Sequence, residues 1–526
     1  MRRPNRFLKR ECKKKQKLEE HNEQQLNKAV KEETPVYPDL DQNLEFIKNV
    51  LGDSSDLVIR EFTIDQPRKK AAVIFFDELI NKELIQNFLI RPLIKLEKTG
   101  AELSDPWKAV VNEVEAGETE EVDQMRKVLE GVLGGDTVLL VDGSEKGLIV
   151  GSKGWATRGV DEPRAEQVVR GPREGLSETL NFSLSMIRHR LRDPSLRVKY
   201  IPVGKRTKTT VAVLYIEEIS EKYIVQEVEE RIKRIKIDGI LEAGYIEEMI
   251  QDQMWTPFPL LQNTERPDTV VSHLLEGKVV VLVDGAPQAL IAPAVFSQFY
   301  NSPEDYYERY LISTFLRLIR LLSLFIALLL PALYIAFISF HPEMIPSDLM
   351  LAMAAGRATV PFSAIVEALI MEISVEILRE ASIRLPGPIG PTIGIVGALV
   401  IGNAAVTAGL VSPAFVIVVG LTTISSYANP NYNAAISIRL LRFPFMIVAA
   451  MFGLFGIMIG LMLLLLHLVQ LRSFGVPYMS PFAPLNLRDL RDSLIRIPWP
   501  WMKKRPTIYQ PHNKIRLKEG GTKDGS

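Results

Sequence analysis

GDTVLLVDGSEKGLIV, residues Gly135–Val150, returns almost unchanged as GKVVVLVDGAPQALIA, residues Gly277–Ala292, at an offset of 142 residues without a gap. Each stretch is an apolar, β-branched run, an Asp-Gly pair and a second apolar run. This pattern is typical of a β-hairpin, because glycine tolerates the positive φ of the turn. We therefore interpret four residues as turn residues: Asp142, Gly143, Asp284 and Gly285. The alternative is that the two aspartates bind a ligand or a cation.

The repeat extends upstream of both hairpins. The alternating run Leu57–Ile64 precedes Arg68–Leu93, and Arg197–Gly204 precedes Arg206–Ile235. Each pair indicates a strand, a basic turn, a buried strand and an amphipathic helix. We predict an α/β cytoplasmic domain made of two duplicated subdomains, residues 41–155 and 195–310.

The segment between them, residues 156–194, is dense in arginine and glutamate. A solvated linker is the simpler interpretation. We favour ion pairs that join the two subdomains or adjacent protomers, because arginine pairs well with carboxylates. The residues proposed for these pairs are Glu162, Arg164, Arg170, Arg173 and Glu174. RGPREG lacks the spacing of a phosphate-binding loop, so no nucleotide site is predicted.

The composition excludes several function classes. Lys plus Arg and Asp plus Glu both number 63, which argues against a nucleic-acid binder. The single cysteine, Cys12, excludes a disulfide within the chain. No nucleophile–base, metal or phosphate motif emerges, so we expect neither an enzyme nor a cofactor. Residues 1–40 form a basic arm, either a solvated tail or a segment that attracts anionic lipid headgroups through Lys13–Lys15 and Lys17.

Residues 311–472 are predicted to form an α-helical polytopic membrane domain. The apolar segments are Leu318–Phe340, Pro361–Pro386, Thr392–Val411, Pro413–Tyr427 and Phe443–Leu471. Basic residues flank the first segment and fill the tail 473–526, so the positive-inside rule places both ends in the cytoplasm. The absence of a signal peptide agrees with this orientation. An even number of crossings follows, and we assign the Glu-rich segment Pro361–Pro386 to a re-entrant or interfacial helix.

The Glu-rich segment carries the strongest functional signal. Glu372, Glu376 and Glu380 stand four residues apart, which predicts that they share one helical face. Arg379 lies on the same side, and Arg384 is four residues after Glu380. Ionisable groups at membrane depth are costly unless they are paired or face water. Three interpretations remain open: an interfacial helix with a wet polar face, the lining of a cation-favouring pore or vestibule, and ion pairs between protomers.

Small and aromatic residues suggest how the membrane domain packs. Gly390 and Gly394 give a face for close helix contact, and Pro386–Pro391 is the alternative candidate for backbone lining a cavity. IPWPW, residues Ile497–Trp501, is typical of an interfacial anchor.

Six longer stretches resemble the A subunit of the GerA-type spore germinant receptors. They are DEPRAEQVVRGPREG (Asp161–Gly175), PFPLLQNTERPD (Pro257–Asp268), EGKVVVLVDGAPQALI (Glu276–Ile291), PEDYYERY (Pro303–Tyr310), VEILREASIRLPGPIGPTIGIVGALVIGNAAV (Val375–Val406) and FGVPYMSPFAP (Phe474–Pro484). The resemblance covers residues 40 to 505 and leaves out the basic arm. It implies a multi-pass protein of the inner spore membrane of a spore-forming bacterium, with its soluble domains on the cytoplasmic side.

The resemblance also implies partners and a function. A subunits of this family work with a transporter-like B subunit and a lipoprotein C subunit, and are thought to oligomerise into an ion-conducting channel. The first hypothesis is a subunit of a nutrient-sensing receptor in which Glu372, Glu376 and Glu380 face the pore. The alternative is an A-type accessory protein linked to ion or dipicolinate release. A transporter is less favoured, because the evident repeat lies outside the membrane half.

Overall fold

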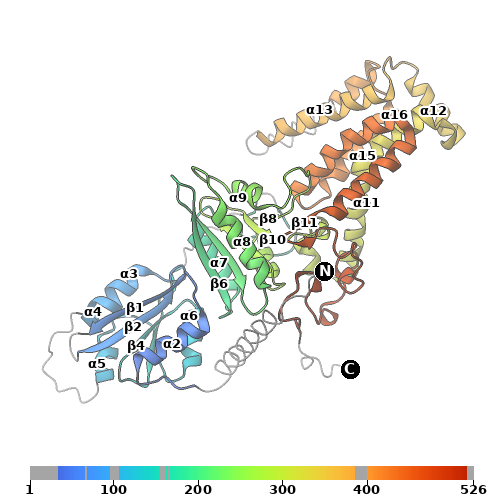
Figure 1. Cartoon of the computed structure of the whole chain (residues 1–526). Coiled ribbons are helices and arrows are strands. Elements are labelled where there is room, and N and C mark those ends of the chain that lie inside the picture. The colour runs from blue at the N-terminus through green and yellow to red at the C-terminus, as the bar shows by residue number, and fades with distance from the viewer. Residues whose placement is uncertain are drawn as a thin grey trace.

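The computed structural model describes residues 34–64, 68–94, 106–154, 162–163, 166–384 and 400–517. Three parts follow one another: a first α/β unit, a second α/β unit and a helix bundle (Figure 1). Most of the predicted basic arm, with Cys12 and the lysines assigned to lipid contact, lies outside the described residues.

The first unit is a five-stranded antiparallel sheet with helices on both faces. Its strands, in spatial order, are β1 (Leu57–Ile64), β2 (Lys69–Phe76), β4 (Thr137–Val141), β5 (Gly147–Val150) and β3 (Thr119–Val122). One face packs on α2 (Leu40–Leu51) and α6 (Met125–Leu133). The other packs on the π-helix η1 (Ile85–Ile90), α4 (Arg91–Ile94) and α5 (Pro106–Glu113), and the short α3 (Lys82–Leu84) precedes η1. The central strand β2 supplies both cores, because successive side chains of a strand point to opposite faces.

The second unit has the same strand order. Its strands are β6 (Leu196–Val203), β7 (Thr209–Ile216), β9 (Val279–Val283), β10 (Ala289–Ala292) and β8 (Gln262–Thr264). One face packs on α7 (Leu180–Arg190) and α10 (Pro267–Leu274), the other on α8 (Lys222–Arg234) and α9 (Ala243–Ile250). The second unit therefore begins with α7, upstream of the predicted boundary at residue 195, because the apolar side of α7 is buried in this core.

Both Asp-Gly turns are tied to the first helix of their own unit. Asp142 Oδ1 accepts a hydrogen bond from the Leu40 amide at 3.4 Å, and Asp284 Oδ1 accepts one from the Leu180 amide at 3.3 Å. Gly143 and Gly285, at φ +79° and +89°, donate to carbonyls just upstream of those helices. A carboxylate at a helix N-terminus satisfies an otherwise unpaired amide. This geometry accounts for both aspartates without a ligand.

The bundle contains helices of very different length. They are α11 (Tyr310–Phe340), α12 (Ser347–Arg357), α13 (Ala364–Arg384), α15 (Pro413–Tyr427) and α16 (Tyr432–Gln470), and residues 400–407 are also helical. Among the described helices, α11 and α16 are long and apolar enough to cross a membrane, and α15 is a shorter apolar helix. Gly390, Gly394 and Pro386–Pro391, to which packing and cavity roles were assigned, lie outside the described residues.

Helix α16 is a hairpin of two antiparallel helices. Gly453 has φ +61° and ψ −142°, which breaks the helix there. A Cβ on Gly460 would lie 2.9 Å from the Phe445 ring, whereas fifteen residues of straight helix span about 22 Å. Ser437 and His467 also bond to the adjacent residues Pro257 and Thr256. The single last span predicted for Phe443–Leu471 is therefore wrong, because glycine at position 453 allows the chain to reverse.

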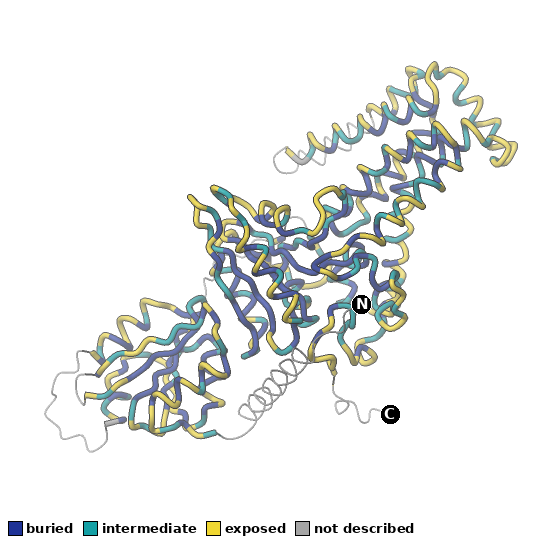
Figure 2. The backbone as a smooth tube through the Cα atoms, in the orientation of Figure 1, coloured by how far each residue is buried: buried dark blue, intermediate teal, exposed yellow. Residues whose placement is uncertain are grey.

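Each bundle helix runs either away from or toward the second unit (Figure 2). Helix α11 leads away, and Phe340 at its far end lies beside Gly453. Helix α15 starts at Ser412, whose hydroxyl lies 2.9 Å from the Tyr334 hydroxyl, and returns to Tyr427. Helix α13 also returns, because Arg379 near its end bonds Ser426. It is a continuous helix, and its re-entrant or interfacial position in a membrane stays a prediction.

The C-terminal segment folds back against the second unit. It contains the short strands β11 (Arg472–Ser473) and β12 (Val476–Pro477) and the 3-10 turns η5 (Asp489–Asp492), η6 (Trp499–Trp501) and η7 (Thr507–Tyr509). Ser473 Oγ donates to the Leu260 carbonyl at 2.7 Å, and Arg505 Nε donates to the Leu275 carbonyl at 2.7 Å. The bundle therefore starts and ends on the side of the soluble units, as the distribution of basic residues had predicted.

Candidate functional site at the junction of the second unit and the bundle

The second unit is fastened to the first bundle helix by one buried carboxylate. Asp305, in the 3-10 turn η3 (Pro303–Tyr306), is 1% exposed. It accepts hydrogen bonds from Arg317 Nε at 3.0 Å and from Arg320 Nη1 at 2.8 Å, both on α11. Arg317 is equally buried. Buried charges of this kind hold a geometry firmly, since separating them leaves an unpaired charge.

The same PEDYYERY stretch contacts three further segments. Tyr306 donates to Asp492 of the C-terminal segment at 3.0 Å, and Tyr307 donates to Asp268 of α10 at 2.5 Å. Glu304 accepts from the Arg170 amide at 3.0 Å. The turn thus joins α11, α10, the connecting segment and the C-terminal segment.

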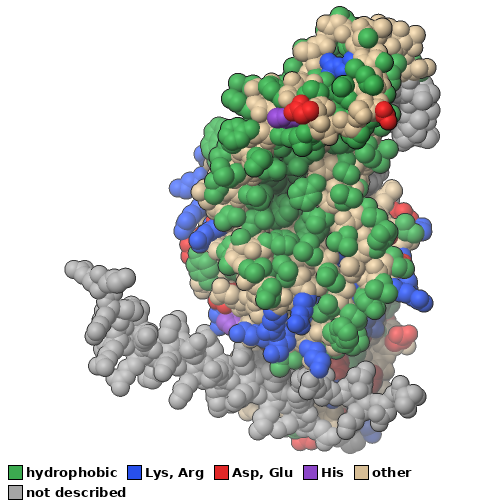
Figure 3. Space-filling model, turned by 90° about the vertical axis from the view of Figure 1, so that its right-hand side faces the viewer, with side chains coloured by type: hydrophobic (Ala, Val, Ile, Leu, Met, Phe, Trp, Pro, Cys, Tyr) green, Lys and Arg blue, Asp and Glu red, His purple; other side chains and the backbone are tan. Residues whose placement is uncertain are grey.

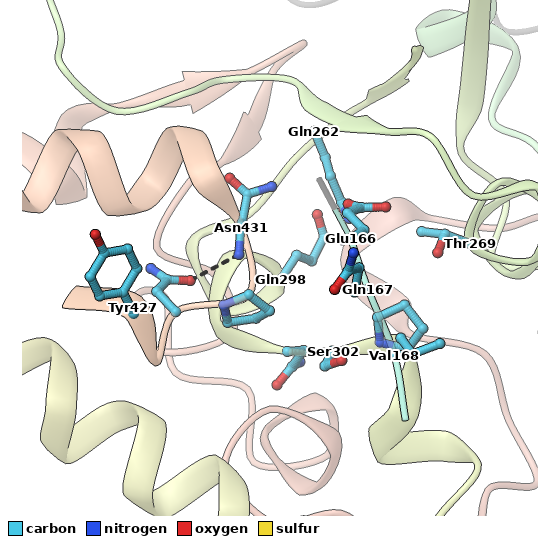
Figure 4. A pocket seen from close by; sticks show the side chains of 13 residues that line it. Glu166, Gln167, Val168, Gln262, Thr269, Gln298, Ser302, Tyr427 and Asn431 are labelled. Carbon is cyan, nitrogen blue, oxygen red and sulfur yellow. Dashed lines mark hydrogen bonds between the residues drawn. The ribbon is translucent and has the colours of Figure 1, made fainter. Parts of the chain in front are cut away.

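A pocket of about 300 Å³ lies beside this turn. Figure 4 shows its walls converging from three parts of the chain: Glu166 and Gln167 from the connecting segment, Gln262 and Gln298 from the second unit, and Asn431 from the start of α16. Asn431 itself caps α16, accepting from the Ala434 amide at 3.0 Å. The lining of amides and hydroxyls suits water or a small polar molecule.

Glu166 is the titratable group of the pocket. Burial raises its pKa to about 7, although the hydrogen bond from Thr264 and the charge of Arg266 oppose that shift. Thr264 Oγ1 lies 2.5 Å from Glu166 Oε2. The carboxyl group therefore changes charge near neutral pH at the point where the second unit meets the bundle.

A second buried cluster secures the C-terminal segment next to the pocket. Lys278 is fully buried, lies 2.9 Å from His273 Nδ1 and sits 4.6 Å from the centre of the Tyr509 ring. Burial lowers the pKa of Lys278 to about 7. Arg516 approaches Glu276 of the same cluster at 3.7 Å.

The Glu-rich helix does not present its carboxylates on one face. Glu372 is fully buried and pairs with Arg442 of α16. Glu376 lies 3.2 Å from Arg379 and 3.6 Å from Arg439, whereas Glu380 and Arg384 form an exposed pair. Each four-residue step turns a helix about 40° past a full turn, so eight residues move Glu380 about 80° from Glu372. The spacing argument overlooked this drift.

The charges of the connecting segment pair with the second unit or with each other. Arg173 lies 3.4 Å from Glu162, Arg170 lies 3.6 Å from Glu308, and Glu174 pairs with Arg190. Arg164 lies outside the described residues. Among these described pairs none reaches the first unit.

The join between the two units is built elsewhere. Arg188 of α7 makes a two-bond contact with Asp56, at 2.7 and 2.9 Å, and both side chains are buried. The Ser55 amide donates to the Val198 carbonyl at 2.8 Å, and Tyr200 donates to Glu78 at 2.6 Å. The sequence analysis missed these residues. The available signal was the helical spacing of Leu180, Leu184 and Ile187, with Arg188 four residues after Leu184.

Comparisons with known proteins place these features in a family. Residues 45–508 match the model of the Bacillus/Clostridium GerA spore germination protein. The chain is 43% identical to spore germination protein KA of Bacillus subtilis (strain 168), over 91% of this chain and 88% of that protein. It is 41% identical to spore germination protein GerLA of Bacillus cereus, over 90% of this chain and 96% of that protein.

A solved structure is also similar in sequence. It is the N-terminal domain of the A subunit of the Bacillus megaterium spore germinant receptor GerK3, 34% identical, with a TM-score of 0.40. The match covers 50% of this chain and 98% of that one.

Proposed function

Because this chain belongs to the Bacillus/Clostridium GerA spore germination protein family, we propose that it is the membrane subunit of a nutrient-sensing spore germination receptor. It acts as an oligomer in the inner spore membrane and contributes the ion-conducting pore that triggers germination. Its partners are further copies of itself, B-type and C-type receptor subunits and membrane lipid. The observation that carries this proposal is the buried Asp305 contact, which couples a soluble unit directly to the first apolar helix.

The surface of the bundle supports a membrane position. Figure 3 shows a broad apolar face with lysine and arginine gathered at its lower edge, toward the soluble part. Apolar side chains on this bundle are exposed, among them Leu322, Phe455 and Met458. A bilayer would cover them, and the basic edge fits the cytoplasmic headgroups.

The two α/β units fit an origin by duplication. They share strand order, the Asp-Gly hairpin and the carboxylate contact to the first helix. The second copy has gained the contacts to the bundle, so it transmits movement or assembly into the membrane. Among the described residues, the first copy joins the second through contacts that include Asp56 and Arg188.

The coupling role is tested by Asp305→Asn in spores. The amide keeps the shape but removes the charge that holds Arg317 and Arg320, so we expect slower nutrient-triggered ion release with the protein still in the membrane. Glu308→Gln is a matched control, because Glu308 is partly exposed and pairs only with exposed Arg170. Normal ion release from the Asp305→Asn spores would refute the coupling.

The pore role is tested at the exposed end of α13. Glu380 is exposed, so Glu380→Gln removes a pore charge without breaking a buried pair. Glu372→Gln would instead leave the buried Arg442 without its carboxylate partner. We expect altered cation release with Glu380→Gln and unchanged release with Glu343→Gln, which is also exposed and lies at the far end of the bundle. Unchanged ion flux at normal protein level would overturn the assignment of α13 to the pore.

A further inference from the structure

The second unit carries an unpartnered apolar patch on and just after α9. Ile246 and Ile250 of this helix are buried in the core of the unit, whereas Tyr245 and Met249 face outward. The following loop ends in Met254 and Trp255, which are 66% and 92% exposed. Leu241, just before the helix, is exposed as well. We call the five outward residues Leu241, Tyr245, Met249, Met254 and Trp255 the α9 patch.

The contacts next to Trp255 fix its level relative to the bundle. Thr256 Oγ1 lies 3.0 Å from His467 Nε2, near the end of the second half of α16. The Pro257 carbonyl accepts from Ser437, near the start of the first half. Trp255 therefore stands beside both near ends of the α16 hairpin.

We propose that the α9 patch, with Trp255 at its tip, inserts into the interfacial layer of the lipid bilayer. This inference rests on the proposed membrane position of the bundle. Tryptophan and tyrosine favour that layer, because their rings are apolar and their N–H and O–H groups remain hydrated. The exposed Trp255, beside the near ends of α16, matches this preference. The lipid that covers the apolar surface of the bundle would then also cover the α9 patch.

The neighbouring charges indicate which lipid property is recognised. Glu247 and Glu248 lie within the same stretch, and Asp252 pairs with Arg231 at 2.8 Å, so the patch residues offer no basic charge of their own to anionic headgroups. Insertion is therefore driven by the apolar and aromatic side chains and is insensitive to salt. The C-terminal segment is different, since Trp501 lies close in sequence to Lys503 and Lys504.

Two such contacts would fix the orientation of the second unit on the bilayer. Trp501, 72% exposed, anchors the side of the C-terminal segment, and Trp255 anchors the side of α9. Asp305 lies in the second unit between these segments in the chain and holds α11. A change in the orientation of the second unit would then require Trp255 or Trp501 to leave the bilayer.

The test uses the full chain in nanodiscs of phosphatidylcholine with or without brominated acyl chains, which quench nearby tryptophan fluorescence. We compare the wild type with Trp255→Phe and Trp107→Phe. Trp107 is the matched control, because it is buried in the first unit. We expect Trp255→Phe to remove a lipid-quenched component of the emission that 1 M salt does not change. Trp107→Phe should remove an unquenched component.

A further variant separates this inference from the membrane position itself. Phe455→Trp, placed in the Trp255→Phe chain, puts a reporter on the exposed surface of α16. If this reporter is quenched by brominated lipid and Trp255 is not, the inference is overturned and the membrane position stands. If neither is quenched, both fail. If Trp255 is protected from brominated lipid and from aqueous acrylamide alike, a protein surface covers it, and the lipid contact is refuted.

Discussion

Replacing Arg188 by methionine should separate the two α/β units. The guanidinium makes two hydrogen bonds to Asp56, one to Ser54, and lies 4.1 Å from the centre of the Phe76 ring. Methionine fills a similar volume but leaves the Asp56 carboxylate, which is 1% exposed, without its cation. Removing one partner of a buried pair costs about 3–5 kcal/mol. The loss falls on the join between the units, because each unit keeps its own core.

The assay is hydrogen exchange of the full chain, read at the Ser55 amide. This amide donates to the Val198 carbonyl across the join, so it exchanges only when the join opens. Each 1.4 kcal/mol changes an equilibrium constant about tenfold, so a loss of about 3–5 kcal/mol should speed exchange of the Ser55 amide by roughly a hundred- to several-thousand-fold. Amides of the central strand β2 should keep their protection.

The matched control is Lys82→Ala, which removes a salt bridge to Asp77 whose lysine is 63% exposed. Such a pair is worth about 0–1 kcal/mol, so exchange at Ser55 should hardly change. An increase of less than tenfold at Ser55 in the Arg188→Met chain would show that the buried pair does not hold the units together.

Three further predictions concern single residues. The pKa of Glu166 is raised to about 7, so between pH 4.5 and 7 the folded chain binds more protons than the unfolded chain, and the resulting stability is lost as pH rises through 7. Glu166→Gln should therefore reduce the drop in the thermal unfolding midpoint between pH 5 and pH 8. Gly453→Ala should lower the free energy of unfolding by roughly 1–3 kcal/mol, because φ is +61° and the new Cβ would lie 3.0 Å from Phe340. Gly420→Ala is the control, since its Cβ would meet open space, and equal thermal stability of the two variants in detergent would contradict the hairpin. Asp284→Ala should cost about 0.5–2 kcal/mol by unpairing the Leu180 amide, with a similar loss for Asp142→Ala, and faster exchange at Leu180 and Leu40 is the measurement.

The sheets were accessible from the sequence because their signals are local. The run Leu57–Ile64 alternates and is strand β1, and the Asp-Gly pairs form the expected turns. The junction was less accessible. PEDYYERY was recognised as a family motif, but nothing in its letters shows that Asp305 meets Arg317 and Arg320 inside a protein core. The pocket brings together segments that lie more than a hundred residues apart, such as Glu166 and Asn431.

The sequence by itself determined the repeated hairpin, the strands beside it and the position of the apolar half, because periodicity and turn chemistry act over a few residues. The tertiary structure decided which charges meet. Arg188 pairs with Asp56 across 132 residues, and Glu372 pairs with Arg442 across 70. It also decided that the last apolar run turns back at Gly453, since one glycine reverses a helix only when a second apolar surface is there to receive the returning half.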